Sequence, residues 1–492
     1  MLRRKSLIGG AIVAPLLSLV AAGTAAGESP TTAGLATAAV VGTSTPGYSD
    51  GVQADSLYAG RGDANIDVLS YDLNLHWYPS AHKLNGVATE EIRPLPAAVT
   101  AGQFKLILAS NLSISSITVD GHPVSGTRSG PTVWITPPLT TVMSPADSMT
   151  VVIAYSGKPA SVLTPTSRTD MGRVGWHNGS HGSVWTMQEP FGAFTWYPVS
   201  DQPSDKAMYT LRVNVPDTMI GISNGKMTHR SAQNGRQTTS FTNAHPMASY
   251  LVTLAIGNYR KATQTGPNGV PITYWFPEGT KARFYPVLSQ TPKLMSWLAS
   301  RLGAYPFESA GVVVVPSRSA VETQSMITFG SGIWRQGSKA AVGDLVHELA
   351  HSWYGDSVTP SDWKNVWMNE GMAMYLQAKY TIFRGWHSQS YWTTKLSQLD
   401  YLWRGKYGPP GNPRRTQFAQ INVYYPPALM WTKLAAKVGP TQMAALIKQW
   451  PVQHKYTSQT RAAYVDWLAG NQTKVDASWF DNWLDSTTTP SS

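Results

Sequence analysis

The sequence of 492 residues contains no cysteine. Disulfide bonds, cysteine ligands for a metal, a thiol nucleophile and a lipid anchor on an N-terminal cysteine are therefore all excluded. Only 14% of the residues are charged, and the 39 Lys and Arg residues are spread along the chain without forming a basic run. The formal net charge of +11 thus gives little support to nucleic-acid binding, and we expect no nucleic-acid partner.

Long apolar runs are also scarce. Three basic residues, Arg3, Arg4 and Lys5, lie near the start of the chain. An apolar run from Leu7 to about Gly23 follows, and the small residues at 24–26 suit a signal peptidase. We therefore expect residues 1–26 to be a signal peptide and the protein to be secreted, with an uncleaved anchor as the alternative. No later segment is apolar enough to span a bilayer, so no membrane span is expected after signal removal.

Removal of residues 1–26 would lower the net charge from +11 to +8, because the three basic residues leave with the signal. Such a moderate excess fits a secreted protein near anionic cell-wall polymers. Electrostatic contact with the cell wall is therefore one expected interaction.

The composition of the chain changes along its length. Residues 27–52 are rich in Thr, Ala, Gly, Ser and Pro, and we expect them to form a flexible lead-in. Residues 53–258 consist of short apolar or alternating runs between turn residues, which predicts an all-β domain, sandwich or saddle-like. Examples are Tyr71–Trp77, Val151–Tyr155 and Leu211–Val215. Residues 259–492 contain one apolar strand, Gly311–Val315, and then long helical patterns. The predicted fold class is thus α+β and multidomain, with the mainly helical domain second.

The most informative motif is His-Glu-Leu-Ala-His at residues 347–351. On a helix, His347 and His351 are one turn apart and project from the same face, where they can hold one ion. Glu348 lies beside them and can take a proton from a metal-bound water. Glu370, on a second helical pattern after eighteen intervening residues, would complete three ligands with one open position. That arrangement is typical of a catalytic zinc rather than a structural one.

Further segments accompany this motif. They are Gly355-Asp356, Asn369-Glu370-Gly371, Gln188-Glu189-Pro190 continuing to Asp201, Ser319-Ala320-Val321-Glu322-Thr323, and Val423-Tyr424 followed by Ala428. Together they resemble the M1 (gluzincin) family of zinc metallo-aminopeptidases, to which aminopeptidase N belongs, in a short two-domain secreted bacterial type. The resemblance implies an all-β domain at 53–258 and a thermolysin-like catalytic domain at 259–492, without the helical-repeat domain of longer members. It also implies one Zn²⁺, held by His347, His351 and Glu370.

The resemblance further implies hydrolysis of the N-terminal peptide bond of peptides that have a free N-terminus. Zinc would polarise the scissile carbonyl and lower the pKa of its bound water to about 7, and Glu348 would be the general base. The Tyr424 hydroxyl would stabilise the oxyanion, although Tyr425 is adjacent and a shift of one residue would exchange them. Asp356 would steady a zinc ligand from behind.

Glu322 and Glu189 correspond to the carboxylates that would bind the substrate amine by charge-assisted hydrogen bonds and so limit cleavage to the first bond. Read alone, Glu189 could be a surface carboxylate and Glu322 a charge at a strand end. Residues 323–329 are expected to form an edge strand that pairs with the substrate backbone. Ser319, Val321 and Thr323 replace the family's Gly, Met and Asn, which predicts a different pocket for the N-terminal side chain.

Two other functions compete with a secreted aminopeptidase. A thermolysin-like zinc endopeptidase would cut blocked peptides, and Glu322 and Glu189 argue against it. A cell-surface binding protein on an inactivated peptidase scaffold would lack a zinc ligand or the general base, whereas this chain retains all four residues.

Overall fold

The structure is a computed structural model that describes residues 51–491. All of these residues belong to one of the two units into which the contacts divide the chain, Gly47–Ser492. The expected signal at 1–26 and nearly all of the expected lead-in at 27–52 lie outside the described residues. Within the described part, no helix combines the length and the apolar character needed to cross a membrane.

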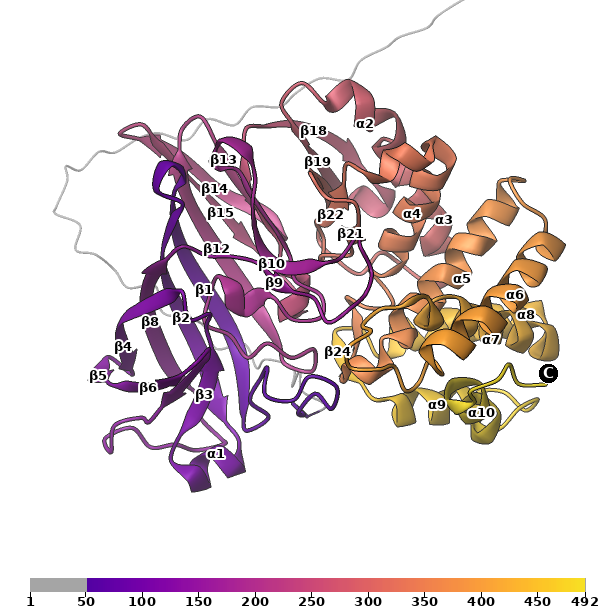
Figure 1. Ribbon diagram of the computed structural model, residues 1–492, viewed down its shortest axis with the longest axis horizontal. Helices are drawn as coiled ribbons and strands as arrows, with labels where there is room; N and C mark the ends of the chain where they lie inside the picture. Colours follow the sequence, from indigo (N-terminus) through magenta and orange to yellow (C-terminus); the bar gives the residue numbers. More distant parts are fainter. Residues whose placement is uncertain (1–50, 492) are drawn as a thin grey trace, which may run out of the picture. The chain divides into compact units, whose positions relative to one another are not determined.

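A nine-stranded sheet forms the first half of the described chain and is drawn in indigo to magenta in Figure 1. Its strands lie in the order β14-β15-β12-β1-β2-β8-β4-β5, with β16 paired to β12. Strand β1 (Ile66–Tyr78) is parallel to β12 and antiparallel to β2, and every second side chain from Tyr71 to Trp77 is buried. This alternation is the predicted pattern for a strand with one face on a core. The other strands are β2 Lys83–Pro94, β4 Leu112–Val119, β5 His122–Val124, β8 Met149–Gly157, β12 Lys206–Pro216, β14 Lys226–Gln233, β15 Arg236–Thr242 and β16 Met247–Ala248.

Two smaller sheets and one short helix, α1 (Pro96–Ala101), complete this region. The five-stranded sheet has the order β13-β17-β11-β10-β9 and the three-stranded sheet the order β3-β7-β6. Their strands are β3 Phe104–Ile107, β6 Gly126–Ser129, β7 Thr132–Ile135, β9 Val162–Leu163, β10 Arg173–Asn178, β11 Val184–Met187, β13 Ile220–Ser223 and β17 Leu254–Gly257. The region is therefore built almost wholly of strands, as the sequence predicts.

A third sheet, of order β18-β19-β20-β22-β21, introduces the helical half. Its strands are β18 Tyr259–Thr265, β19 Pro271–Pro277, β20 Ala310–Val315, β21 Ala320–Val321 and β22 Ile327–Gly330. Strand β20 is the predicted apolar strand, and all of its residues are buried.

The predicted edge strand at 323–329 is wrong. Strand β22 starts only at Ile327 and lies inside the sheet between β20 and β21, so the edge strand is β21. The preceding residues form a turn instead, because the Thr323 hydroxyl donates to the Met326 carbonyl and Ser325 adopts a left-handed φ of 59°.

Nine helices follow α1 in the described chain and are drawn mostly in orange to yellow (Figure 1). They are α2 Lys281–Leu288, α3 Thr291–Leu302, α4 Ser338–Ala350, α5 Trp367–Phe383, α6 Gln389–Tyr407, α7 Tyr425–Val438, α8 Pro440–Gln453, α9 Arg461–Gly470 and α10 Ala477–Asp485. A two-stranded parallel sheet, β23 (Val358–Pro360) with β24 (Thr457–Gln459), lies among them. Helix α4 packs on α5, and α5 packs on α7. The order of a β-rich part before a helical part confirms the predicted fold class.

One continuous apolar core joins the β-rich part to the helices. It contains Tyr71 from β1 and Trp196 from the turn after residues 193–195, together with Leu345 and Trp367 from α4 and α5. A close-packed interior holds its side chains in fixed positions. Residues from the β-rich part and from the helices can therefore keep fixed positions relative to one another around one site.

Candidate active site

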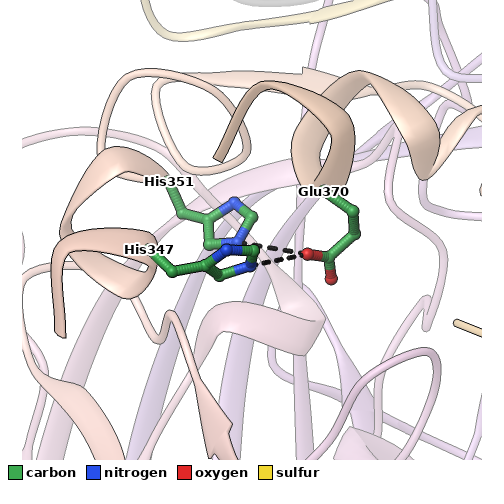
Figure 2. A group of neighbouring side chains, drawn as sticks. All are labelled: His347, His351 and Glu370. Carbon is green, nitrogen blue, oxygen red and sulfur yellow. Dashed lines mark hydrogen bonds and ion pairs between the residues drawn. The ribbon is translucent and has the colours of Figure 1, made fainter. Parts of the chain in front are cut away.

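Helices α4 and α5 bring His347, His351 and Glu370 together, as Figure 2 shows. His347 Nε2 lies 2.9 Å and His351 Nε2 lies 3.5 Å from the same carboxylate oxygen, Glu370 Oε2. All three side chains are buried. The i, i+4 spacing therefore gives the predicted shared face, and the first turn of α5 supplies the carboxylate opposite it.

A hydrogen bond on the side of the His351 ring away from Glu370 fixes the orientation of that ring. Its Nδ1 lies 3.0 Å from the Tyr354 backbone oxygen, and a carbonyl can only accept a hydrogen bond. Nδ1 must therefore donate, so that in the neutral ring, the form that binds a metal, Nε2 carries the lone pair and faces Glu370. A backbone carbonyl behind a histidine in this way is the usual support of a metal ligand.

These donors fit a zinc ion. The ligand atoms of His347, His351 and Glu370 all lie within 4.8 Å of one another, and two imidazoles with one carboxylate are a donor set that zinc prefers. Burial alone would raise the pKa of Glu370, but hydrogen bonds from both histidines hold it well below its usual value. Burial lowers the pKa of His351, yet the charges of Glu322 and Glu370 raise it well above normal. The pocket is thus short of positive charge, which a divalent cation would supply.

Glu348 lies next to this group in the same cavity and is 9% exposed. One carboxylate oxygen of Glu348, one of Glu322 and one ring nitrogen of His351 form a second set of atoms within 4.8 Å of one another. Burial is the main cause of a pKa well above the usual value for Glu348, and the charges of Glu322 and Glu370 add to it. A carboxyl group shifted in this direction is suited to exchanging protons near neutral pH.

Glu189 and Glu322 face the same cavity from the other side of the site. Glu189 follows β11 and Glu322 follows β21, and both are nearly fully buried. Oε1 of each residue is buried and has no hydrogen-bond partner among the described residues. Burial, together with the charge of Glu322, raises the pKa of Glu189 well above its usual value. Unpartnered buried carboxylate oxygens are costly, and because these two face a cavity they are available to a donor from outside the chain.

Tyr424 stands immediately before α7, with its ring nearly parallel to that of His347 at 5.9 Å. Its hydroxyl accepts a hydrogen bond of 2.9 Å from Arg168 Nη1. A close approach of α5 and α7 makes this placement possible, since a Cβ on Gly371 would lie 2.5 Å from a side-chain carbon of Pro427. Helix α7 starts at Tyr425 with Pro426 next in the chain, a place where proline is tolerated because the first turn has no intrahelical acceptor for its missing N–H.

Tyr425 lines the same cavity, but the charged groups near it differ from those near Tyr424. Burial raises its pKa, and the charges that raise it further are those of Asp344 and Tyr391 rather than of Glu370. Of the two tyrosines, Tyr424 is therefore the one that stacks on a predicted zinc ligand.

Among the described residues the Asp356 side chain is not the hydrogen-bond partner of His351, and its support of a zinc ligand stays a prediction. The Nδ1 hydrogen bond goes to the Tyr354 carbonyl, because the chain turns back after α4 and the Asp356 amide donates to the His351 carbonyl at 2.9 Å. The Asp356 backbone carbonyl instead accepts from the buried ammonium of Lys206, at 2.7 Å.

The cavity around these residues has a volume of about 410 Å³. Beyond the predicted residues, its polar lining includes Arg168, Asp170, Arg318, Gln336, Asp344, Gln377 and Gln420. Sequence patterns miss Arg168, which is 256 positions from Tyr424 and belongs to no motif. Asp344 could have been found, because it precedes Glu348 by one turn on the same predicted helical face.

Comparison with known proteins matches both halves of the chain. Residues 68–251 match the peptidase M1 N-terminal domain, and residues 287–407 match the peptidase family M1 domain. Aminopeptidase N of Acetobacter pasteurianus is 27% identical over 245 residues, which cover 46% of this chain and 67% of that protein. Glutamyl aminopeptidase of Sus scrofa is 27% identical over 206 residues, which cover 39% of this chain but only 22% of that protein. The chain thus spans a minor part of the longer relatives.

Solved structures match a larger share of this chain than the sequence relatives do. The M1 zinc metallopeptidase of Deinococcus radiodurans has 25% sequence identity and a TM-score of 0.76, covering 89% of this chain and 98% of that one. A variant of that enzyme bound to a Tyr-Ser-Ala substrate has a TM-score of 0.77 at 25% identity, covering 89% of this chain and 99% of that one.

Proposed function

Because the chain belongs to peptidase family M1, we propose that it is a secreted zinc aminopeptidase that hydrolyses the N-terminal bond of peptides. The family, the class of peptide-bond hydrolase and the zinc cofactor predicted from the sequence are confirmed by the domain matches and by the solved M1 zinc metallopeptidases. One observation carries the aminopeptidase proposal. It is the pair of buried carboxylates, Glu189 and Glu322, whose Oε1 atoms lack partners within the described chain.

His347, His351 and Glu370 would hold the zinc ion. When bound there, zinc supplies a Lewis acid for the scissile carbonyl and a means of acidifying a water.

Glu189 and Glu322 would bind the α-ammonium group of the substrate. An ammonium carries three N–H donors and a positive charge, so it can satisfy both unpartnered oxygens and relieve the repulsion between the two carboxylates. A blocked N-terminus offers neither the charge nor the donors. An endopeptidase would have to bury an uncharged segment of backbone against these carboxylates, which disfavours the alternative function.

Glu348 would move the proton. Its carboxylate would take a proton from the attacking water and pass it to the nitrogen of the leaving peptide, as a general base and then a general acid. The elevated pKa that burial gives this carboxyl supports such a role, because the protonated form remains accessible near neutral pH.

Tyr424 would stabilise the negative charge that develops on the carbonyl oxygen. Its oxygen already accepts from Arg168, so its own hydrogen is free to be donated into the cavity. Arg168 is in turn fixed by an ion pair of 2.6 Å with Asp170 and by a hydrogen bond of 2.9 Å to the Ala419 carbonyl. The hydroxyl is therefore held in place before substrate arrives, which is how oxyanion donors reduce the barrier.

The remaining parts of the proposal concern organisation and location. We place the boundary between the β domain (53–258) and the catalytic domain (259–492) where β18 starts the third sheet. Export rests on the basic start and apolar run of residues 1–26, and contact with the cell wall rests on the net positive charge. The substrate-bound relative from Deinococcus radiodurans supports peptides as the substrates.

The test compares aminoacyl-fluorophore substrates with their N-acetylated forms, using zinc-loaded protein and Glu348→Gln as the inactive control. Turnover of the free amines alone, abolished in the control, is the expected result. Equal turnover of acetylated substrates would remove the role of Glu189 and Glu322 and leave an endopeptidase. Inactivity on every substrate would instead favour a binding scaffold.

A further inference from the structure

The active-site cavity continues along α4 beyond the predicted zinc ligands and includes Asp344 in its lining. His347 and Glu348 come three and four residues after Asp344, and His351 comes four and three residues after those two, so all four lie on one face of the helix. At 1.5 Å per residue, Asp344 and His351 are about 10 Å apart along the helix axis. The helix face therefore gives the cavity a direction, with Asp344 at one end and His351 at the other.

The two proposed amine anchors lie at the His351 end. One carboxylate oxygen of Glu322 lies within 4.8 Å of one ring nitrogen of His351 and of one carboxylate oxygen of Glu348. Glu189 is under the electrostatic influence of Glu322, Glu370 and His351, whereas the charge of Asp344 acts on Glu348 and Tyr425. A peptide with its amine on Glu189 and Glu322 and its scissile carbonyl at the zinc ligands must therefore continue toward Asp344. Its second residue is the one that arrives there.

Asp344 has no cationic partner at that end. Among residues 51–491 its carboxylate accepts one hydrogen bond, of 3.2 Å from Gln377 Nε2, and forms no ion pair. The cavity lining also holds three uncharged side chains: Gln377, which donates to Asp344, Tyr425, on which the charge of Asp344 acts, and Met374, one turn before Gln377 on α5. A methionine and a tyrosine ring can cover the aliphatic stem of a long side chain while the carboxylate meets its charged end. The wall thus matches a lysine or an arginine.

We propose that Asp344 selects peptides whose second residue is lysine or arginine. This inference rests on the proposed aminopeptidase function, because the free amine sets which residue reaches Asp344. A glutamate at the second position would be disfavoured, since two carboxylates would then share a half-buried space.

The test uses peptides of sequence Leu-X-Ala-Ala, with X as Arg, Lys, Met or Glu, and measures kcat/KM for release of leucine at about pH 8, above the pKa of about 6 to which burial raises Asp344. For the wild type we expect Arg and Lys to exceed Met by about fivefold to tenfold, and Met to exceed Glu, as for an ion pair in a partly buried cleft. Asp344→Asn should bring the Arg-to-Met ratio to within about twofold, and Asp344→Glu should retain the preference.

A matched control is Asp170→Asn, which neutralises a carboxylate in the same cavity that is already paired with Arg168. It should leave the Arg-to-Met ratio of the wild type in place even if the overall rate changes. A wild type without a basic preference, or a preference that survives in Asp344→Asn, would overturn the inference and leave the aminopeptidase function standing. Failure to release leucine from any of the four peptides would overturn both.

Discussion

Buried carboxylates occur in two regions of this protein, and their surroundings differ. In the β-rich part, Asp63 accepts hydrogen bonds from the backbone amides of Asn65 (3.1 Å) and Lys105 (2.9 Å). In the cavity, Glu189 and Glu322 are as deeply buried, yet each has an oxygen with no partner among the described residues. Burial alone therefore does not identify a functional acid. A carboxylate satisfied by backbone amides stabilises the fold, whereas an unpartnered one facing a cavity is available to a ligand.

Glu90 departs from this division. It lies on β2 in the nine-stranded sheet, and neither of its oxygens has a partner within the described residues. Burial, together with the charge of Asp205, raises its pKa well above the usual value. Glu90 is thus expected to remain protonated in the fold, and it makes the comparison testable on stability as well as on activity.

The largest loss of activity is expected for substitution of Glu348, the proposed general base. Glu348→Gln keeps the shape of the side chain but cannot accept a proton, so kcat should fall by about 10²- to 10⁴-fold. Thermal unfolding should show no loss of stability, because the buried carboxylate accepts no hydrogen bond from a side chain or backbone group of residues 51–491. A variant with near-normal kcat on aminoacyl-fluorophores would contradict its role as the base.

Tyr424→Phe removes only the hydroxyl held by Arg168, and kcat should fall by about 10²- to 10³-fold with little change in KM. Tyr425→Phe is the matched control and should cost less than about tenfold. If the larger loss belonged to Tyr425→Phe, the assignment of the oxyanion donor would move by one residue.

Glu322→Gln and Glu189→Gln each replace one anchor by a neutral amide. Since a hydrogen bond to a charged group contributes about 1.5–3 kcal/mol, kcat/KM for free-amine substrates should fall by about 10- to 150-fold in each variant. The unfolding temperature should stay the same or rise, because an unpartnered buried charge is removed. If either variant lost as much stability as Asp63→Ala, the carboxylate would be one that stabilises the fold, as Asp63 does, rather than one that binds substrate.

Asp63→Ala is the converse experiment. It would leave two backbone amides in the β-rich part without acceptors and should lower the free energy of unfolding by about 2 kcal/mol. Activity of the folded fraction should match the wild type, because Asp63 does not line the cavity. Chemical denaturation followed by tryptophan fluorescence measures the first quantity and steady-state kinetics the second.

Glu90→Gln should have the smallest effect, and one that depends on pH. The raised pKa in the folded state means that its stabilising contribution is complete below the unfolded pKa of about 4.5 and is lost as pH rises toward the folded pKa. The variant should therefore unfold at a higher temperature than the wild type at alkaline pH and at a similar one near pH 4. An equal difference at both pH values would mean that Glu90 does not titrate with folding.

Much of the site follows from local patterns. The His347–His351 spacing and the helical pattern around Glu370 predict two helices with one shared face, and a 3.6-residue period is all that this requires. The alternation in Tyr71–Trp77 likewise predicts β1. Patterns with a fixed period are readable because each residue's position depends only on its near neighbours.

The features that no local sequence pattern predicts depend on contacts between segments far apart in the chain. The hydrogen bond from Arg168 to Tyr424 joins positions 256 residues apart, and no local pattern encodes it. The prediction that residues 323–329 form an edge strand is wrong for the same reason. Which strand lies at the edge depends on how β20, β21 and β22 pair, and not on the residues of one strand. Whether Glu189 and Glu322 are partnered is likewise a property of the folded chain alone.

The central claim is that Glu189 and Glu322 are free to bind an ammonium group. Calorimetric titration of zinc-loaded protein with L-leucinol, which has a free amine and no bond to hydrolyse, and with N-acetyl-leucinol tests it directly. The account predicts that leucinol binds, that the acetylated form does not, and that Glu322→Gln weakens leucinol binding by at least about tenfold. Equal binding of the two compounds, or unchanged binding of leucinol to Glu322→Gln, would contradict it.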